Sequence, residues 1–315
     1  MPELSDLRFL TVAGKGGVGR TTVSAAIALA AARRGKRPLV AMCNAKERLS
    51  TLLETPAVGP RITTILEVKG PSGANVPIDA VNLVPEIALA EYGMMVLKVR
   101  ALYKAIFENR FVAAFLRATP GMDQWAMLGK AFFHTTEERE PGRPRYDVVI
   151  LDAPATGHSL EMLRVPKVIL DVAPPGLLRR EAEHAWTLLS DPARAGIVLV
   201  TLPEEMPTNE TLEHYAALRD ELQLPVARLV VNAFLPVLFD PPALSGLERL
   251  VSTSHDGDPL QSLISASRAR ATREGLQEES LERMVREIHV PRTELPRLFV
   301  PKFGRSAVDA LSRAF

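Results

Sequence analysis

Close to its amino terminus the chain reads Gly14-Lys15-Gly16-Gly17-Val18-Gly19-Arg20-Thr21-Thr22. The glycine spacing, followed by a cation and a threonine, matches the general pattern GxxxxGK[ST] of a phosphate-binding loop. In such a loop the backbone N–H groups surround phosphate oxygens, and the threonine hydroxyl, here that of Thr21, binds Mg²⁺. A glycine-rich turn without a ligand is the alternative, and the joint presence of glycines, cations and threonines disfavours it. We therefore predict that residues 14–22 bind the phosphates of ATP or ADP together with Mg²⁺.

The sequence around this loop predicts the fold class. Leu7–Val12 is a short apolar run, residues 21–34 are rich in alanine and helical in character, and Leu39–Met42 forms a second apolar run. This is the pattern of a βαβ unit, whose strands are normally parallel. Further buried strands are expected at residues 147–151, 196–201 and 228–232. Short apolar runs that alternate with longer helices indicate an α/β fold with a doubly wound, mainly parallel sheet.

The phosphate-binding pattern occurs once and the chain shows no internal repeat, so we expect a single nucleotide-binding domain over residues 1–315. Two segments depart from the strand–helix alternation. Residues from about 84 to about 140 are almost wholly helical in pattern, and we interpret them as a helical subdomain inserted in the domain. A second helical segment, polar and rich in arginine and glutamate, is expected from about 237 to about 288.

Composition excludes several classes of function. The chain has 38 basic and 37 acidic residues and a net charge of +1, so nothing indicates a nucleic-acid partner. Its one cysteine, Cys43, excludes an internal disulfide and, within one chain, a zinc or iron–sulfur site built from several cysteines. Acidic residues stand at the amino terminus, and no apolar run reaches the roughly 18 residues of a membrane span. We therefore expect a cytoplasmic protein without a transmembrane segment.

A second motif, Asp152-Ala153-Pro154-Ala155-Thr156-Gly157-His158-Ser159-Leu160, follows directly on a predicted strand. In P-loop proteins, the acid that holds the water shell of Mg²⁺ stands at this position, the end of a buried strand. We accordingly predict that Asp152 binds Mg²⁺ through water. Taken alone, Asp-Ala-Pro would favour a strand-end turn or a helix cap for Asp152, and His158 would be a structural histidine; the whole nine-residue motif disfavours this alternative.

Together these motifs resemble a known family. The loop is similar to the deviant Walker A loop of an ATPase class that includes nitrogenase iron protein, the septum-site and partition ATPases, and the arsenical-pump and tail-anchored-protein-targeting ATPases. Residues 152–160 resemble the switch II sequence DTAPTGHTL of the arsenical-pump and targeting branch. Further segments that resemble this branch, in the same order, are residues 120–123, 202–211, 229–232 and 295–301.

The resemblance implies roles for particular residues. Lys15 would reach across a dimer interface to the partner's nucleotide. Asn232 would contact adenine, and the segment that ends at Pro301 would close over the base. The implied partners are a second copy of the chain or a paralogue, and a client helix or membrane protein.

The chain also departs from the family. Arg20 stands where a P-loop normally has lysine. With Leu49 and Ser50 as the register, Asn44 replaces the aspartate that orients the attacking water. An amide hydrogen-bonds a water but cannot accept its proton. A register shifted by one residue would place Cys43 there, and Glu47 is the nearest acidic candidate. The catalytic candidates are thus Asn44, Asp152 and Lys15. We expect slow ATP hydrolysis, because Asn44 and Arg20 replace the usual aspartate and lysine.

Three functions remain open from the sequence. The first is a nucleotide-switched dimer that acts in protein targeting or chaperoning. The second is a catalytically degenerate regulatory subunit paired with an active paralogue. The third is the motor of an anion pump, which the single cysteine disfavours because the resemblance would imply a metalloid site of several cysteines.

Overall fold

The computed structural model describes residues 3–43, 47–97, 121–238, 240, 242–243, 245–246, 249–250 and 261–315. Asn44, Pro120 and the centre of the predicted helical subdomain lie outside these ranges. The predictions made for them are therefore not addressed by the structure.

The described residues form an eight-stranded sheet in the order β10-β9-β8-β1-β7-β2-β4-β3, with β3 antiparallel to β4 and every other pair parallel. The strands are β1 (Phe9–Gly14), β2 (Pro38–Cys43), β3 (Thr63–Lys69), β4 (Asn75–Leu83), β7 (Val148–Asp152), β8 (Ala195–Thr201), β9 (Val226–Phe234) and β10 (Arg292–Pro296). A separate hairpin consists of β5 (Glu138–Glu140) and β6 (Arg143–Pro144).

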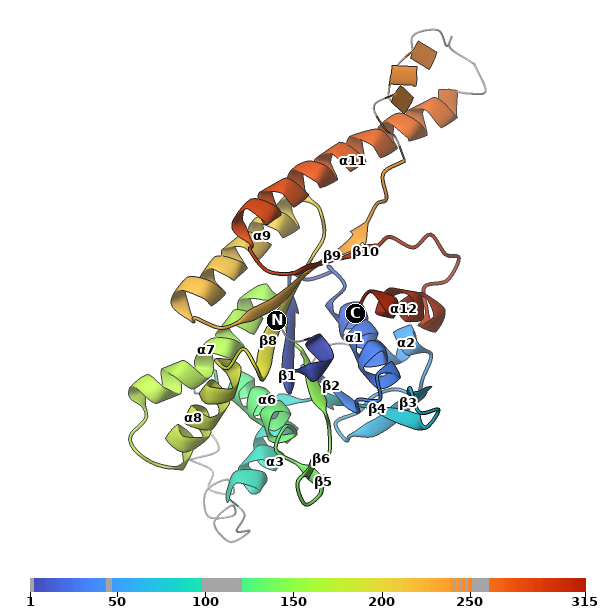
Figure 1. Cartoon of the computed structure of the whole chain (residues 1–315). Helices are drawn as coiled ribbons and strands as arrows, with labels where there is room; N and C mark the ends of the chain where they lie inside the picture. Colours follow the sequence, from blue (N-terminus) through green and yellow to red (C-terminus); the bar gives the residue numbers. More distant parts are fainter. Residues whose placement is uncertain are drawn as a thin grey trace.

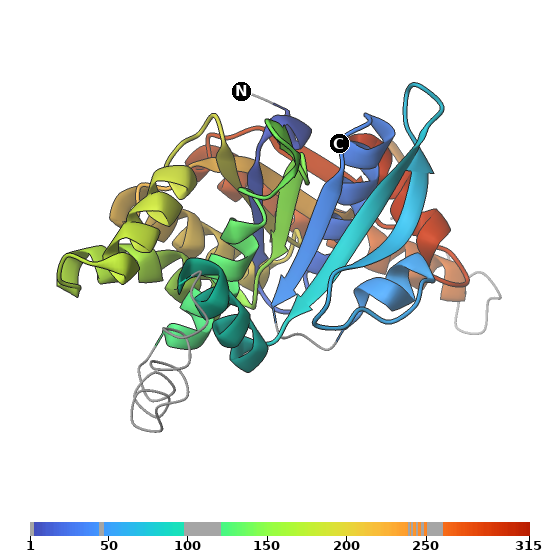
Figure 2. The same cartoon turned by 90° about the horizontal axis from the view of Figure 1, so that it is seen from below.

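Helices cover both faces of this sheet (Figures 1 and 2). One face carries α1 (Arg20–Arg33), α2 (Leu49–Leu53) and α12 (Arg305–Leu311). The other face carries α3 (Pro85–Leu97), α6 (Met122–Phe133), α7 (Thr156–Val172), α8 (Leu177–Leu189), α9 (Glu205–Ala216) and the carboxyl-terminal end of α11 (Gln261–Glu287). The remaining short pieces are η1 (Leu4–Asp6), η2 (Ala217–Glu221) and η3 (Ser312–Ala314).

The central strand β1 shows why the sequence forms these layers. Successive side chains of a strand point to opposite faces. Phe9 and Ala13 therefore pack under the α6–α9 layer, whereas Leu10 and Val12 pack under α1. Because both faces are buried, all six residues of the strand are buried and Thr11 is its one polar side chain, so the strand shows no polar alternation. The small side chains in the alanine-rich helix α1 allow its backbone to lie close to the sheet.

The structure confirms the predicted α/β class with a doubly wound, mainly parallel sheet. All five runs predicted as buried strands lie within or overlap β1, β2, β7, β8 and β9. The sequence analysis did not find β3, β4 or β10. These strands lie at the two ends of the sheet, and β3 and β10 have mostly polar, exposed residues, so the apolar runs that marked the central strands are missing there. The hairpin β5–β6 follows α6, with β5 at the end of the segment that was expected to be helical and β6 just beyond it.

Candidate nucleotide-binding site

The glycine-rich loop connects the end of β1 to the start of α1, at the carboxyl edge of the sheet. Gly17 and Gly19 have φ angles of 89° and 95°, in the left-handed region that favours glycine. A Cβ atom on Gly19 would lie 2.2 Å from Asn232 Nδ2, and one on Gly14 would lie 2.2 Å from the backbone oxygen of Val200. The loop is therefore packed tightly against β8 and β9, and two of its glycines are required by space.

Two predicted magnesium residues meet beside this loop. β1 and β7 are neighbours, with Val12 opposite Asp152, so the strand ends place Asp152 next to the start of α1. Thr21 Oγ1 donates a hydrogen bond of 2.6 Å to Asp152 Oδ2. Asp152 is only 5% exposed, and its Oδ1 has no hydrogen-bond partner among the described residues. Burial raises the pKa of Asp152 to about 6, although the Thr21 hydrogen bond and the charge of Arg20 act in the opposite direction.

This pair fits a magnesium ion. A threonine hydroxyl and a carboxylate with an unpartnered oxygen are oxygen ligands, which Mg²⁺ prefers, and Mg²⁺ usually retains several of its waters in nucleotide sites. A divalent cation would also compensate the buried negative charge of Asp152.

The two cations of the loop contact groups of the chain itself. Arg20 turns back on the loop, and its Nη1 donates to the backbone oxygens of Gly14 and, at 3.0 Å, of Lys15. Lys15 Nζ lies 2.8 Å from Glu210 Oε1 on α9, and both side chains are partly exposed. Lys15 Nζ would have to leave Glu210, and Arg20 Nη1 the loop carbonyls, before these nitrogens could bind a phosphate.

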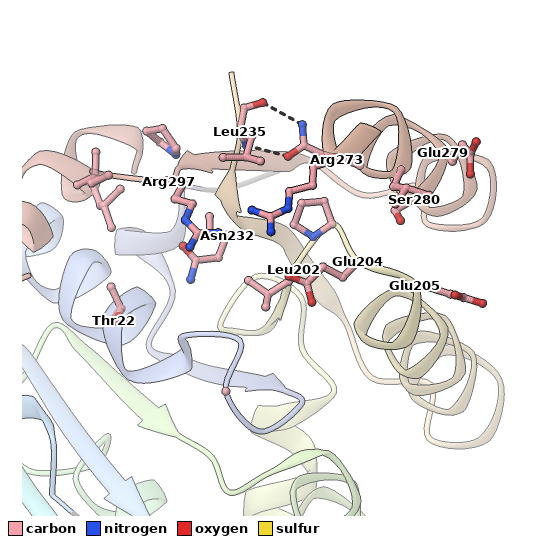
Figure 3. A pocket seen from close by; sticks show the side chains of 18 of the residues that line it. Thr22, Leu202, Glu204, Glu205, Asn232, Leu235, Arg273, Glu279, Ser280 and Arg297 are labelled. Carbon is pink, nitrogen blue, oxygen red and sulfur yellow. Dashed lines mark hydrogen bonds between the residues drawn. The ribbon is translucent and has the colours of Figure 1, made fainter. Parts of the chain in front are cut away.

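A cavity of about 1050 Å³ opens from the loop between β9, α9, α11 and the segment that follows β10 (Figure 3). Asn232 and Arg297 project into one side of it, and Ser280 and Glu279 of α11 lie at the other. Asn232 also donates from Nδ2 to the backbone oxygen of Val18 at 2.8 Å, which ties β9 to the loop. The lining residues are Gly17, Thr22, Leu202, Pro203, Glu204, Glu205, Asn232, Ala233, Leu235, Arg273, Leu276, Gln277, Glu279, Ser280, Arg283, Pro296, Arg297, Leu298, Phe303 and Leu311.

Helix α11 forms one wall of the cavity and holds the chain that leaves β9. The buried Gln277 accepts from the backbone N–H of Leu235 at 2.7 Å and donates to its backbone oxygen at 2.9 Å. Glu274 accepts from the N–H of Leu238 at 3.2 Å and pairs with Arg270 at 2.6 Å. The sequence analysis predicted a polar helix in this region without assigning it to the site. Polar residues that are buried by tertiary contacts give no periodic apolar signal.

Some of the predicted site residues line the cavity and others do not. Gly17, Thr22 and Asn232 line one cavity, whereas Pro301 is exposed and lies outside its lining. Neighbours of Pro301 in sequence, from Pro296 to Leu298 and Phe303, line it instead.

Glu47, the acidic candidate near Asn44, is already engaged. It accepts hydrogen bonds from the Ser50 backbone N–H at 2.7 Å and from the Ser50 hydroxyl, and a longer one of 3.4 Å from the N–H of Val58. These bonds cap the first turn of α2. The side chain of His158 is exposed, and its partner among the described residues is Glu161, at 3.3 Å. This contact does not assign His158 to the site.

This fold, with a glycine-rich loop after β1 and an aspartate at the end of the neighbouring β7, is that of the P-loop NTPases. The sequence model of the anion-transporting ATPase (ArsA) family matches residues 7–173, more than half of the 315 residues. The chain belongs to this family.

Several named proteins are similar to it. ATPase BagA of Mycobacterium tuberculosis is 29% identical over 243 residues, which cover 77% of this chain and 70% of BagA. ATPase GET3C of Arabidopsis thaliana is 24% identical, over 75% of this chain and 69% of GET3C. A putative arsenical pump-driving ATPase of Halobacterium salinarum is 26% identical, over 74% of this chain and 36% of that protein.

Across the part of the chain that the structure describes, no helix combines the length and the apolar character needed to cross a membrane.

Proposed function

We propose that the protein binds ATP with Mg²⁺, hydrolyses it slowly, and acts as a nucleotide-switched dimer in protein targeting or chaperoning. The observation that carries this proposal is the pairing of Thr21 with the buried Asp152 beside a glycine loop that opens into a large cavity. The similarity to GET3C and to arsenical pump-driving ATPases supports ATP as the nucleotide.

In the proposed complex the backbone N–H groups of residues 14–22 surround the phosphates, and the amino end of α1 favours their negative charge. Thr21 would hold Mg²⁺ directly and Asp152 would hold it through water. When bound, Mg²⁺ supplies positive charge to the phosphate oxygens. The base would occupy the part of the cavity between Asn232 and Arg297, with the apolar Leu298 as a neighbour.

Slow turnover follows from the residues near the expected position of the attacking water. Asn44 offers an amide and no base, and Glu47 is occupied by Ser50 and α2. Arg20 brings a planar guanidinium where a P-loop lysine brings a compact charge, so charge on the β and γ oxygens is placed differently. Both features leave binding intact and weaken the chemical step.

Dimerisation would depend on Lys15. Its ammonium group is paired with Glu210 of the same chain, so reaching a partner's nucleotide requires that this ion pair opens. Because both side chains are partly exposed, the pair is weak enough to exchange. Lys15→Ala should preserve ATP binding by a single chain and abolish the closed dimer, which analytical ultracentrifugation with a non-hydrolysable ATP analogue measures.

The decisive test is calorimetric titration with ATP and Mg²⁺ followed by steady-state hydrolysis. Wild type should bind and turn over well below about 1 s⁻¹, a low value for enzymes. Asn44→Asp and Arg20→Lys should each raise the rate, and a recovered general base is worth up to about 10²- to 10⁴-fold. Absence of ATP binding would overturn the whole proposal. Wild-type turnover of about 1 s⁻¹ or more would contradict only the part that predicts slow hydrolysis.

A catalytically degenerate subunit is the second candidate, favoured by Arg20 and Asn44 together. In that case the chain would bind ATP and remain inactive alone, while a mixture with an active paralogue would exceed the rate of the paralogue alone. Asn44→Asp and Arg20→Lys would then restore activity to the isolated chain only if dimer formation is also possible.

A further inference from the structure

Strand β9 contains an extra residue where it reaches the cavity. The register between β9 and β10 is regular up to Val231 and resumes at Phe234. Between these two positions β9 has two residues, Asn232 and Ala233, whereas β10 has only Leu295. Two residues opposite one make a β-bulge, and bulges are common next to active sites, where they change the direction of a side chain.

Ala233 has an unusual backbone conformation for its place in the chain. Its φ angle is 54°, in the left-handed region. The other described non-glycine residues with such an angle are Glu54 and Gln223. Both lie at the carboxyl end of a helix, where this conformation is common, since Glu54 caps α2 and Gln223 follows the cap of η2. Ala233 lies inside a strand instead, and a left-handed alanine there is strained.

The bulge sets the direction of the side chains at the end of β9. Val231 packs in the core under the α6–α9 layer, and strict alternation would turn Phe234 to the opposite face of the sheet. Because of the extra residue, Phe234 packs against the same core as Val231. Asn232 bonds the backbone oxygen of Val18 in the phosphate-binding loop. Ala233 is left between Asn232 and Phe234, partly buried, in the lining of the cavity.

We propose that Ala233 is a binding residue for the base of ATP, whose methyl group contacts the base and whose small size leaves room for it. This inference rests on the proposed ATP-binding function. Glycine would adopt the left-handed angle without steric cost, so a contact between the methyl group and a ligand would offset the strain of alanine. Leu235 and Leu298 line the same cavity, and the methyl group would extend the apolar surface on which a flat ring packs.

The test compares the binding of ATP and of inorganic triphosphate, each with Mg²⁺, by calorimetry. Ala233→Gly keeps the backbone angle and removes the methyl group, so ATP affinity should fall about fourfold, the value of one buried methyl group. Ala233→Asn also tolerates the left-handed angle, but its larger side chain should occupy the place of the base and lower ATP affinity about tenfold or more. Neither variant should change triphosphate affinity by more than about twofold, because triphosphate has no base.

The matched control is Gln223→Gly, which also replaces a left-handed residue by glycine, at an exposed position outside the cavity lining. It should bind ATP like the wild type. The melting temperatures of Gln223→Gly and Ala233→Gly should move in the same direction, because both changes relieve the same backbone strain.

Unchanged ATP affinity in either Ala233 variant, or equal losses for ATP and triphosphate, would overturn the inference. A fall in melting temperature in Ala233→Gly alone would also overturn it, because the methyl group would then pack against the protein itself. If the wild type binds neither ATP nor triphosphate, the proposed function fails instead.

Discussion

The two ends of the cavity, which we propose bind the phosphates and the base of ATP and call the phosphate end and the base end, are constructed in different ways. The phosphate end is one continuous loop, Gly14–Thr22, joined by Asp152 from the neighbouring strand. The base end combines β9, α9, α11 and the segment after β10, which are far apart in sequence and are held together by side chains that bind backbone groups. In the proposed complex, phosphate contacts would therefore depend on a local backbone conformation, whereas base contacts would depend on many replaceable side chains. Substitutions at the phosphate end should therefore have the larger effects.

The largest effect is expected from Asp152→Asn. Removing the carboxylate should lower ATP turnover by about 10²- to 10³-fold, as the loss of one preorganised charged group commonly does. Steady-state hydrolysis at saturating ATP measures this. Turnover within about threefold of wild type would show that the phosphate end does not depend on Asp152.

The same variant should be more stable without nucleotide and Mg²⁺. Because the pKa of Asp152 in the folded protein is about 6 and its ordinary value is 3.8, the folded state disfavours the charged carboxyl. This cost is complete above about pH 6 and absent below about pH 4. Asparagine removes it, so the free energy of unfolding near neutral pH should rise by on the order of 1 to 3 kcal/mol. Urea unfolding near pH 7.5 and near pH 4 tests this, and an equal gain at both values would contradict it.

Gly19→Ala should reduce ATP affinity by about 100-fold. The left-handed φ of Gly19 costs alanine roughly 1 to 2 kcal/mol, and the new Cβ would displace Asn232, which adds roughly the value of a hydrogen bond. Calorimetry gives the affinity. The matched control is Gly17→Ala in the same loop, where φ is +89° and a Cβ meets nothing within 4 Å. If both variants bind ATP alike, backbone strain and not the contact with Asn232 explains the loss.

Asn232→Ala should lower the affinity for ATP about tenfold and the affinity for inorganic triphosphate much less, because Asn232 belongs to the base end. Comparison of the two ligands by calorimetry sharpens the contrast between the ends of the cavity. An equal loss for both ligands would mean that the hydrogen bond from Asn232 to Val18 supports the loop, and that the two ends act as one unit.

The smallest effect is expected from Gln277→Ala, about threefold on ATP affinity. The change leaves the backbone N–H and C=O of Leu235 without their partner and loosens the segment after Asn232. Glu278→Ala, one residue along α11 and exposed, should leave ATP affinity unchanged. A larger loss from Gln277→Ala than from Asn232→Ala would show that α11, and not the direct contact, controls the base end.

The sequence by itself determined the fold class and the phosphate end. Apolar runs mark the strands buried on both faces, and a glycine loop that must adopt left-handed φ leaves a recognisable pattern at Gly14, Gly17 and Gly19. Asp152 could be predicted because an acid at the end of a buried strand stands out against its apolar neighbours.

Only the tertiary structure decided which distant side chains meet. The hydrogen bonds between Gln277 and Leu235 and the ion pair of Lys15 with Glu210 each join residues from different parts of the chain. Polar contacts of this kind follow no period along the chain. Their energy arises when folding buries both partners together, so no local sequence pattern records them.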